Sequence, residues 1–96
     1  MEKEICVITG ANCGIGYEVA RQMAPMGYTL ILACRNPQRG NEAVAKLLRS
    51  FPQADISFMK LDLASKKSIE DFAKSYIESG KKLKILINNA GKLYYC

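Results

Sequence analysis

The chain has 96 residues, 49% of them hydrophobic and 24% charged, which is typical of one small globular domain. This composition argues against a collagen-like repeat, an intrinsically disordered segment and a coiled coil, and no apolar stretch is long enough to predict a membrane span. The net charge of +5 comes from basic residues spread among acids, so nothing predicts a nucleic-acid partner.

The cysteines and the N-terminus indicate a reducing compartment. The sequence has four cysteines, no Cys-x-x-Cys pair and no histidine, so we expect no metal site. Cys6 and Cys34 lie in apolar runs and are expected to be buried free thiols. Residues 1–4 lead directly into the first apolar run without a signal segment, and the default expectation is therefore a cytoplasmic protein.

Strand and helix signals alternate along the whole chain. Short β-branched apolar runs predict buried strands, and apolar residues three or four positions apart predict the helices between them. In chain order we expect a strand at 4–9, a helix at 14–24, a strand at 28–34, a helix from Pro37, a strand at 56–61, a helix capped by Ser65 or Ser68, and a strand at 83–87.

The second and third helices have signals at their ends. Asn36 precedes Pro37 and is suited to be an N-cap, and Pro52 closes this second helix. Gly80 is expected to cap the C-terminus of the third helix. The third helix is also expected to bury one apolar face, made of Ile69, Phe72, Ala73, Tyr76 and Ile77.

Continuous apolar strands predict a parallel sheet covered by helices on both faces. We therefore expect an α/β fold of the Rossmann type, a three-layer αβα arrangement over residues 1–96 with about four strands in the order 3-2-1-4. In a complete sheet of this kind the fourth strand is interior. Here it would be an open edge, which indicates a truncated architecture and allows self-association.

The turn at residues 9–16 has the properties of a pyrophosphate site. Gly10 allows the chain to turn out of the strand, Gly14 allows close approach to phosphates, and Gly16 allows the following helix to pack on the sheet. The start of that helix adds N–H donors and the positive end of its dipole. An ordinary glycine-containing turn is the alternative.

The ends of the later strands provide three further candidate contacts. At Arg35 and Asn36 no acid is present to bind a ribose 2′-hydroxyl, whereas an arginine can pair with a 2′-phosphate, so NADP(H) is favoured over NAD(H). Asp62 and Leu63 are placed to meet the adenine, unless Asp62 only caps the next turn. Residues 88–91 are expected to form an Asn/Gly turn beside the first strand. This turn either allows close approach of the cofactor or is a plain turn, and both alternatives stay open.

Taken together, these motifs resemble the short-chain dehydrogenase/reductase family over residues 4–91, and residues 31–36 resemble its NADP-preferring, retinol-dehydrogenase-like branch. The resemblance implies a nicotinamide dinucleotide as partner and an oxidoreductase that interconverts alcohols and carbonyls. Retinoid or other lipid-like alcohols are what the branch suggests, and some of its members are membrane-associated. The cofactor-binding residues that it implies are Gly10, Asn12, Cys13, Gly14, Ile15, Gly16, Arg35, Asn36, Asp62, Leu63, Asn89, Ala90 and Gly91.

The resemblance implies no catalytic residue within these 96 positions. The family uses a Ser and a Tyr-x-x-x-Lys pair, in which the lysine lowers the pKa of the tyrosine. Here, in contrast, Tyr17, Tyr28 and Tyr76 are followed four positions later by Arg21, Leu32 and Gly80. We therefore expect the isolated chain to be inactive. Two alternatives stay open: a non-catalytic module that pairs with a full-length homologue, and a structural unit without a ligand.

Overall fold

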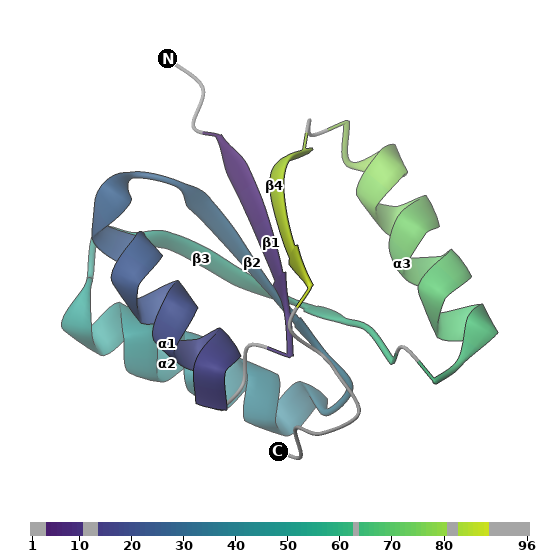
Figure 1. Cartoon of the computed structure of the whole chain (residues 1–96), viewed down its shortest axis with the longest axis horizontal. Helices are drawn as coiled ribbons and strands as arrows, with labels where there is room; N and C mark the ends of the chain where they lie inside the picture. Colours follow the sequence, from purple (N-terminus) through teal and green to yellow (C-terminus); the bar gives the residue numbers. More distant parts are fainter. Residues whose placement is uncertain (1–3, 11–13, 63, 81–82, 89–96) are drawn as a thin grey trace.

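A computed structural model shows an open parallel sheet with helices on both faces (Figure 1). It describes residues 4–10, 14–62, 64–80 and 83–88. No helix in these ranges is both long and apolar enough to cross a lipid bilayer. The elements are β1 (Ile5–Thr9), α1 (Gly14–Met23), a 3₁₀ turn η1 (Ala24–Met26), β2 (Thr29–Cys34), α2 (Pro37–Ser50), β3 (Asp55–Lys60), α3 (Lys66–Glu78) and β4 (Leu83–Asn88).

These elements follow the predicted alternation, with two differences in detail. The first helix ends one residue early, at Met23, and the chain continues as the 3₁₀ turn η1, in which Pro25 is the second residue and Gly27 is the C-cap with a φ of 89°. Asn88, predicted as part of a turn, is the last residue of β4 and pairs with Thr9 of β1. Pairing with a central strand thus extends β4 by one residue beyond its apolar run.

The sheet has the predicted order, β3-β2-β1-β4, and every pair of neighbouring strands is parallel. The hydrogen-bond ladder continues past the strand ends. Gly10 N donates to Ala33 O at 2.8 Å, and Leu61 N donates to Cys34 O at 2.8 Å. The segments that follow β1, β2 and β3 are therefore fixed to one another at the carboxyl edge of the sheet.

Helices α1 and α2 cover one face of the sheet and form the larger part of the core (Figure 1). Because side chains alternate along a strand, every second residue of β1 and β2 points to these helices. The buried residues of this cluster are Cys6, Ile8, Ala20, Ala24, Leu30, Leu32, Ala43, Leu47 and Ile56. Cys6 and Cys34 are buried free thiols, as predicted, and burial raises the pKa of both.

Helix α3 lies on the opposite face of the sheet and is the only helix among the described residues that covers it (Figure 1). Phe72 and Tyr76 pack on the second core cluster, and their rings stack with centroids 6.3 Å apart. The buried members of this cluster are Ile5, Val7, Ile31, Ala33 and Leu61. This face is therefore covered by one row of half-buried aromatic side chains.

The prediction of one broad buried face on α3 was wrong for three of its five members. Ile69, Ala73 and Ile77 are exposed, with Ile77 at 75% of its full accessible surface. The reason is geometric: a single helix on a sheet presents only one row of side chains to it. A second row, four residues apart, needs a neighbouring element beside the helix.

The ends of α2 and α3 are formed largely as the sequence predicts. Asn36 is the N-cap of α2, and its Oδ1 accepts hydrogen bonds from the backbone N–H groups of Gln38 at 2.9 Å and Arg39 at 3.2 Å. For α3 the structure selects Ser65 as N-cap. Its C-cap is Ser79 rather than Gly80, which follows in the left-handed conformation with a φ of 71°.

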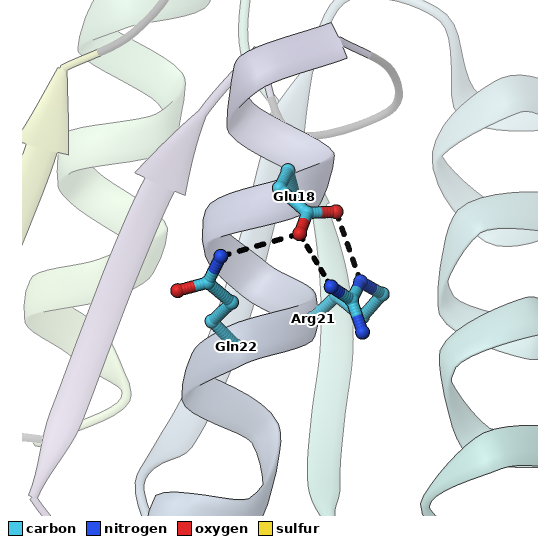
Figure 2. A network of polar contacts seen from close by, with 3 residues as sticks. All are labelled: Glu18, Arg21 and Gln22. Atoms are coloured by element: carbon cyan, nitrogen blue, oxygen red, sulfur yellow. Dashed lines mark hydrogen bonds and ion pairs between the residues drawn. The ribbon is translucent and has the colours of Figure 1, made fainter.

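The solvent-exposed side of α1 has a small polar network, shown in Figure 2. The guanidinium of Arg21 donates two hydrogen bonds to the carboxylate of Glu18, one of them from Nε at 2.9 Å, and Gln22 donates a third at 3.2 Å. The hydrogen bond from Arg21, followed by that from Gln22, lowers the pKa of Glu18 to about 2.

Candidate functional site

The candidate site lies at the carboxyl edge of the sheet, where the segments after β1, β2 and β3 meet. Parallel strands end at the same edge, and in open α/β sheets ligands bind beyond this edge. The ladder bonds from Gly10 and Leu61 to the neighbouring strands hold these segments in place. The structure therefore places Gly10, Arg35 and Asp62, three of the predicted site residues that it describes, along one edge of the sheet.

The turn after β1 has the backbone geometry that a phosphate site needs. Gly10 and Gly14 adopt φ values of 63° and 62°, a left-handed conformation that favours glycine. A Cβ added to Gly14 would meet no atom within 4 Å, so the space beside this backbone is open. Gly16 is buried in the first turn of α1, and the side chain of Ile15 is 54% exposed. Asn12 and Cys13 lie outside the described residues.

The first turn of α1 adds the electrostatics of an anion site. The first N–H groups of a helix have no partner within the helix, and they carry partial positive charge. α1 contains no acidic residue in its first turn that would repel an anion. Open space, glycine backbone and helix start therefore fit a pyrophosphate at this turn.

The segment after β2 exposes one arginine on a fixed backbone. Cys34 is buried at the end of the strand, and the side chain of Asn36 is engaged in capping α2. Arg35, between them, is exposed, as is Arg39 one turn into the helix. The first turn of α2 contains no acid. The cap role of Asn36 is confirmed, whereas its predicted contact with a cofactor stays a prediction.

Gly40, which is not among the predicted site residues, determines how closely α2 approaches the strands. It is buried, and a Cβ added to it would overlap the ring of Phe58 and lie 2.9 Å from Cys34 Sγ. The Cys34 thiol in turn donates to Asn36 O at 3.4 Å. A glycine inside an otherwise amphipathic helix is the sequence signal for such a close approach.

The segment after β3 is held by three hydrogen bonds around Asp62. Its backbone N–H donates to Ser68 Oγ at 2.8 Å, its carbonyl O accepts from Ser65 N at 3.0 Å, and its Oδ1 accepts from Ala64 N at 3.0 Å. Asp62 therefore does cap a turn, which was one of the two predicted roles. Leu63 lies outside the described residues, and the part of Ser68 was not predicted.

The segment after β4 contains the last group of predicted residues. β4 pairs with β1 up to Asn88 and Thr9, so its carboxyl end lies beside the end of β1. Asn89, Ala90 and Gly91 lie outside the described residues, and their cofactor contacts stay predictions.

The tyrosines on the helices lack the environment of a catalytic base. Tyr76 Oη is buried without a hydrogen bond to the described residues, and burial raises the pKa of Tyr76 instead of lowering it. Lys46 Nζ lies 5.1 Å from the ring centroid of Tyr17, over the ring, where it forms a cation–π contact. Among the described residues no group of three His, Cys, Asp or Glu side chains could hold a metal ion.

A parallel αβ sheet with a glycine turn at its carboxyl edge defines a Rossmann-like protein, and comparison with known sequences gives its family. The profile described as "short chain dehydrogenase" matches residues 4–94, and the chain belongs to this family. It is 45% identical over 87 residues to the WW domain-containing oxidoreductase of Gallus gallus and 43% identical over 88 residues to retinol dehydrogenase 12 of Mus musculus. These alignments cover 91% and 92% of this chain but only 21% and 28% of the relatives.

Solved structures give the same assignment. The menthone neomenthol reductase of Mentha piperita superposes with a TM-score of 0.85 at 37% identity, over 95% of this chain and 32% of that one. The L-sorbose reductase of Gluconobacter frateurii, determined with NADPH and L-sorbose, superposes with a TM-score of 0.82 at 30% identity, over 95% of this chain and 34% of that one. This chain therefore spans about a third or less of the length of each of these four proteins.

Proposed function

We propose that residues 1–96 form the NADP(H)-binding part of an oxidoreductase that interconverts alcohols and carbonyl compounds. The main supporting observation is the turn from β1 to α1, where Gly10 and Gly14 have positive φ and open space lies beside Gly14. A bound nicotinamide cofactor supplies or accepts the hydride in such a reaction. The residues of this chain bind and orient it.

Each segment at the carboxyl edge has a part in this proposal. The pyrophosphate lies against the glycine turn, where backbone N–H groups and the start of α1 bind it. The loop after β3, with Asp62 and Leu63, meets the adenine. Asn89, Ala90 and Gly91, after β4, lie near the ribose on the nicotinamide side. In this proposal the adenine lies beyond β3, the pyrophosphate beyond β1 and the nicotinamide-side ribose beyond β4. The parts of the cofactor thus follow the order of the strands across the sheet, β3-β2-β1-β4.

Arg35 is the proposed determinant of the choice between the two cofactors. Its exposed guanidinium has a planar set of donors that matches a 2′-phosphate, and no acid in the first turn of α2 competes for it. An acid would instead be needed to accept hydrogen bonds from a ribose 2′-hydroxyl. We therefore propose NADP(H) rather than NAD(H).

The 96-residue chain alone is proposed to be inactive in carbonyl reduction. Among the described residues, Tyr17, Tyr28 and Tyr76 each lack a lysine four positions later, and the pKa of Tyr76 is raised. Detectable NADPH oxidation with a carbonyl substrate, at rates limited by this protein, would contradict this.

A second candidate function is a non-catalytic module that pairs with a homologous chain. The observation that favours it is the exposed apolar row of Ile69, Ala73 and Ile77 on α3, since such a row is suited to pack against another element. Sedimentation of the chain alone and with a full-length relative distinguishes the two functions, because only the pairing module forms a stable complex.

The proposed cofactor preference is tested by calorimetric titration with NADPH and NADH. The wild-type chain is expected to bind NADPH about 10-fold more tightly or better, and Arg35→Ala should remove this preference, because charge-assisted hydrogen bonds contribute about 1.5–3 kcal/mol. Arg39→Ala is the matched control, an exposed arginine one turn further along. Equal or tighter binding of NADH by the wild type would refute the proposal.

A further inference from the structure

The loop that follows β3 is attached to α3 through a single side chain. Ser68 Oγ accepts a hydrogen bond of 2.8 Å from the backbone N–H of Asp62, six residues earlier. On its other side the loop is attached to the sheet, because Leu61 N donates to Cys34 O. The backbone at Asp62 is thus held between strand β2 and helix α3.

The hydroxyl of Ser68 has a different role from that of a capping residue. Ser65 is the N-cap of α3, and its Oγ accepts from Ser68 N at 3.1 Å. In a capping box the third helical residue, here Ser68, would reach back to the backbone N–H of the cap. Here Ser65 N instead donates to Asp62 O, and the Ser68 hydroxyl extends past the helix end to Asp62 N.

These bonds also fix the direction of the Asp62 carboxylate. Its Oδ1 accepts from Ala64 N at 3.0 Å, while Oδ2 has no hydrogen bond to any described residue. An ionised carboxylate oxygen is an acceptor only, so its natural partner is an N–H donor. The exocyclic amine of an adenine ring is such a donor, and the loop lies at the ligand-binding edge of the sheet.

We propose that Ser68 is a positioning residue for the adenine end of the cofactor. Its hydroxyl fixes the backbone of Asp62, and this holds the carboxylate Oδ2 toward the adenine amine. The inference rests on the proposed cofactor-binding function and adds to it a residue on α3, outside the strand-end segments that the motifs cover. Ser68 itself does not touch the ligand.

The test uses the 96-residue chain with two probes, adenosine 2′,5′-bisphosphate, which contains the adenine, and reduced nicotinamide mononucleotide, which does not. The variants are Ser68→Ala, Ser68→Thr and Ser65→Ala. The Ser65 variant is the matched control, because it removes the cap of the same helix and keeps the Ser68–Asp62 bond. Dissociation constants are measured by NMR titration, and hydrogen exchange is measured at the Asp62 amide.

We expect Ser68→Ala to weaken binding of the bisphosphate by about 3- to 10-fold, the effect of one lost hydrogen bond, with no change for the mononucleotide. Ser68→Thr retains the hydroxyl and restores binding. Ser65→Ala lowers the stability of α3 and leaves the dissociation constant within about twofold. Exchange of the Asp62 amide becomes faster in Ser68→Ala than in Ser65→Ala, because only Ser68→Ala removes its hydrogen bond in the closed state.

Three outcomes would overturn the inference, and they are distinguishable. If the wild type binds the bisphosphate and Ser68→Ala binds it equally well, Ser68 has no positioning role and the proposed function stands. If Ser68→Ala and Ser65→Ala weaken binding equally, the cause is the stability of α3. If the wild type binds neither the bisphosphate nor NADPH, the proposed function fails, and the inference fails with it.

Discussion

Replacing Gly40 by alanine tests how closely α2 must pack on the strands. In an exposed helix position, glycine to alanine stabilises a protein by about 1 kcal/mol, because alanine has the higher helix propensity. Gly40 is buried instead, and an added Cβ would overlap the Phe58 ring and lie 2.9 Å from Cys34 Sγ. We therefore expect Gly40→Ala to destabilise the fold.

The expected size follows from these two opposing contributions. Inserting a methyl group into a packed site costs about 1–3 kcal/mol, and forcing the Phe58 ring out of place lies in the upper part of this range. Subtracting about 1 kcal/mol of helix propensity leaves a net loss of about 1–2 kcal/mol. If Phe58 is first replaced by alanine, most of the overlap disappears and Gly40→Ala should cost close to nothing.

The assay is urea denaturation followed by far-ultraviolet circular dichroism on the four proteins of the Gly40→Ala and Phe58→Ala double-mutant cycle. A coupling free energy of about 1–2 kcal/mol between the two substitutions is expected. Ala45→Gly, at an exposed position of the same helix, measures the propensity contribution separately. If Gly40→Ala stabilises the wild type as at an exposed site, α2 does not pack on Phe58 as described and the reasoning is refuted.

Two further predictions concern the exposed surface. Asn36→Ala should lower the free energy of unfolding in urea by about 1 kcal/mol, while Asn36→Asp, which keeps the cap acceptor, should have little effect; equal losses in both variants would exclude a role of the cap. The Glu18 carboxyl should titrate in NMR spectra with a pKa of about 2, against 4.5 for the free group. Because the folded pKa is the lower one, this pair stabilises the fold fully above pH 4.5 and progressively less as the pH falls toward 2, and 0.5 M salt or Arg21→Ala should return the pKa toward 4.5. A wild-type pKa near 4.5 at low salt would show that Arg21 and Glu18 are not paired in solution.

Much of the fold could be predicted because its signals are local. The β-branched runs and the helical spacing gave the elements, and the right-handed crossover rule then gave the strand order. The caps at Asn36 and Ser65 were predictable because a capping hydrogen bond joins a side chain to a backbone group only two or three residues away. Such a bond depends only on the neighbouring sequence. Gly10 and Gly14 were predictable for the same reason, since a sharp turn requires a positive φ there.

The missed features all depend on contacts between elements. Gly40 is critical because Phe58, on the next strand, occupies the space beside it. The hydrogen bond between Asp62 N and Ser68 Oγ forms only because the first turn of α3 lies beside the segment that follows β3. The apolar residues Ile69 and Ile77 have helical spacing, yet spacing cannot show whether anything lies beside the helix to cover them.

The unequal covering of the sheet has a consequence for local unfolding. On one face, α1 and α2 contribute fully buried side chains, whereas none of the residues of α3 is fully buried. Segments with few buried apolar contacts open at a lower free-energy cost than the core. The amides of α3 are therefore expected to exchange with solvent through openings that leave β1 and β2 protected, and Ser68 belongs to this less stable helix. Separation of α3 from the sheet would then release the loop at Asp62 without unfolding the glycine turn at the other end of the site.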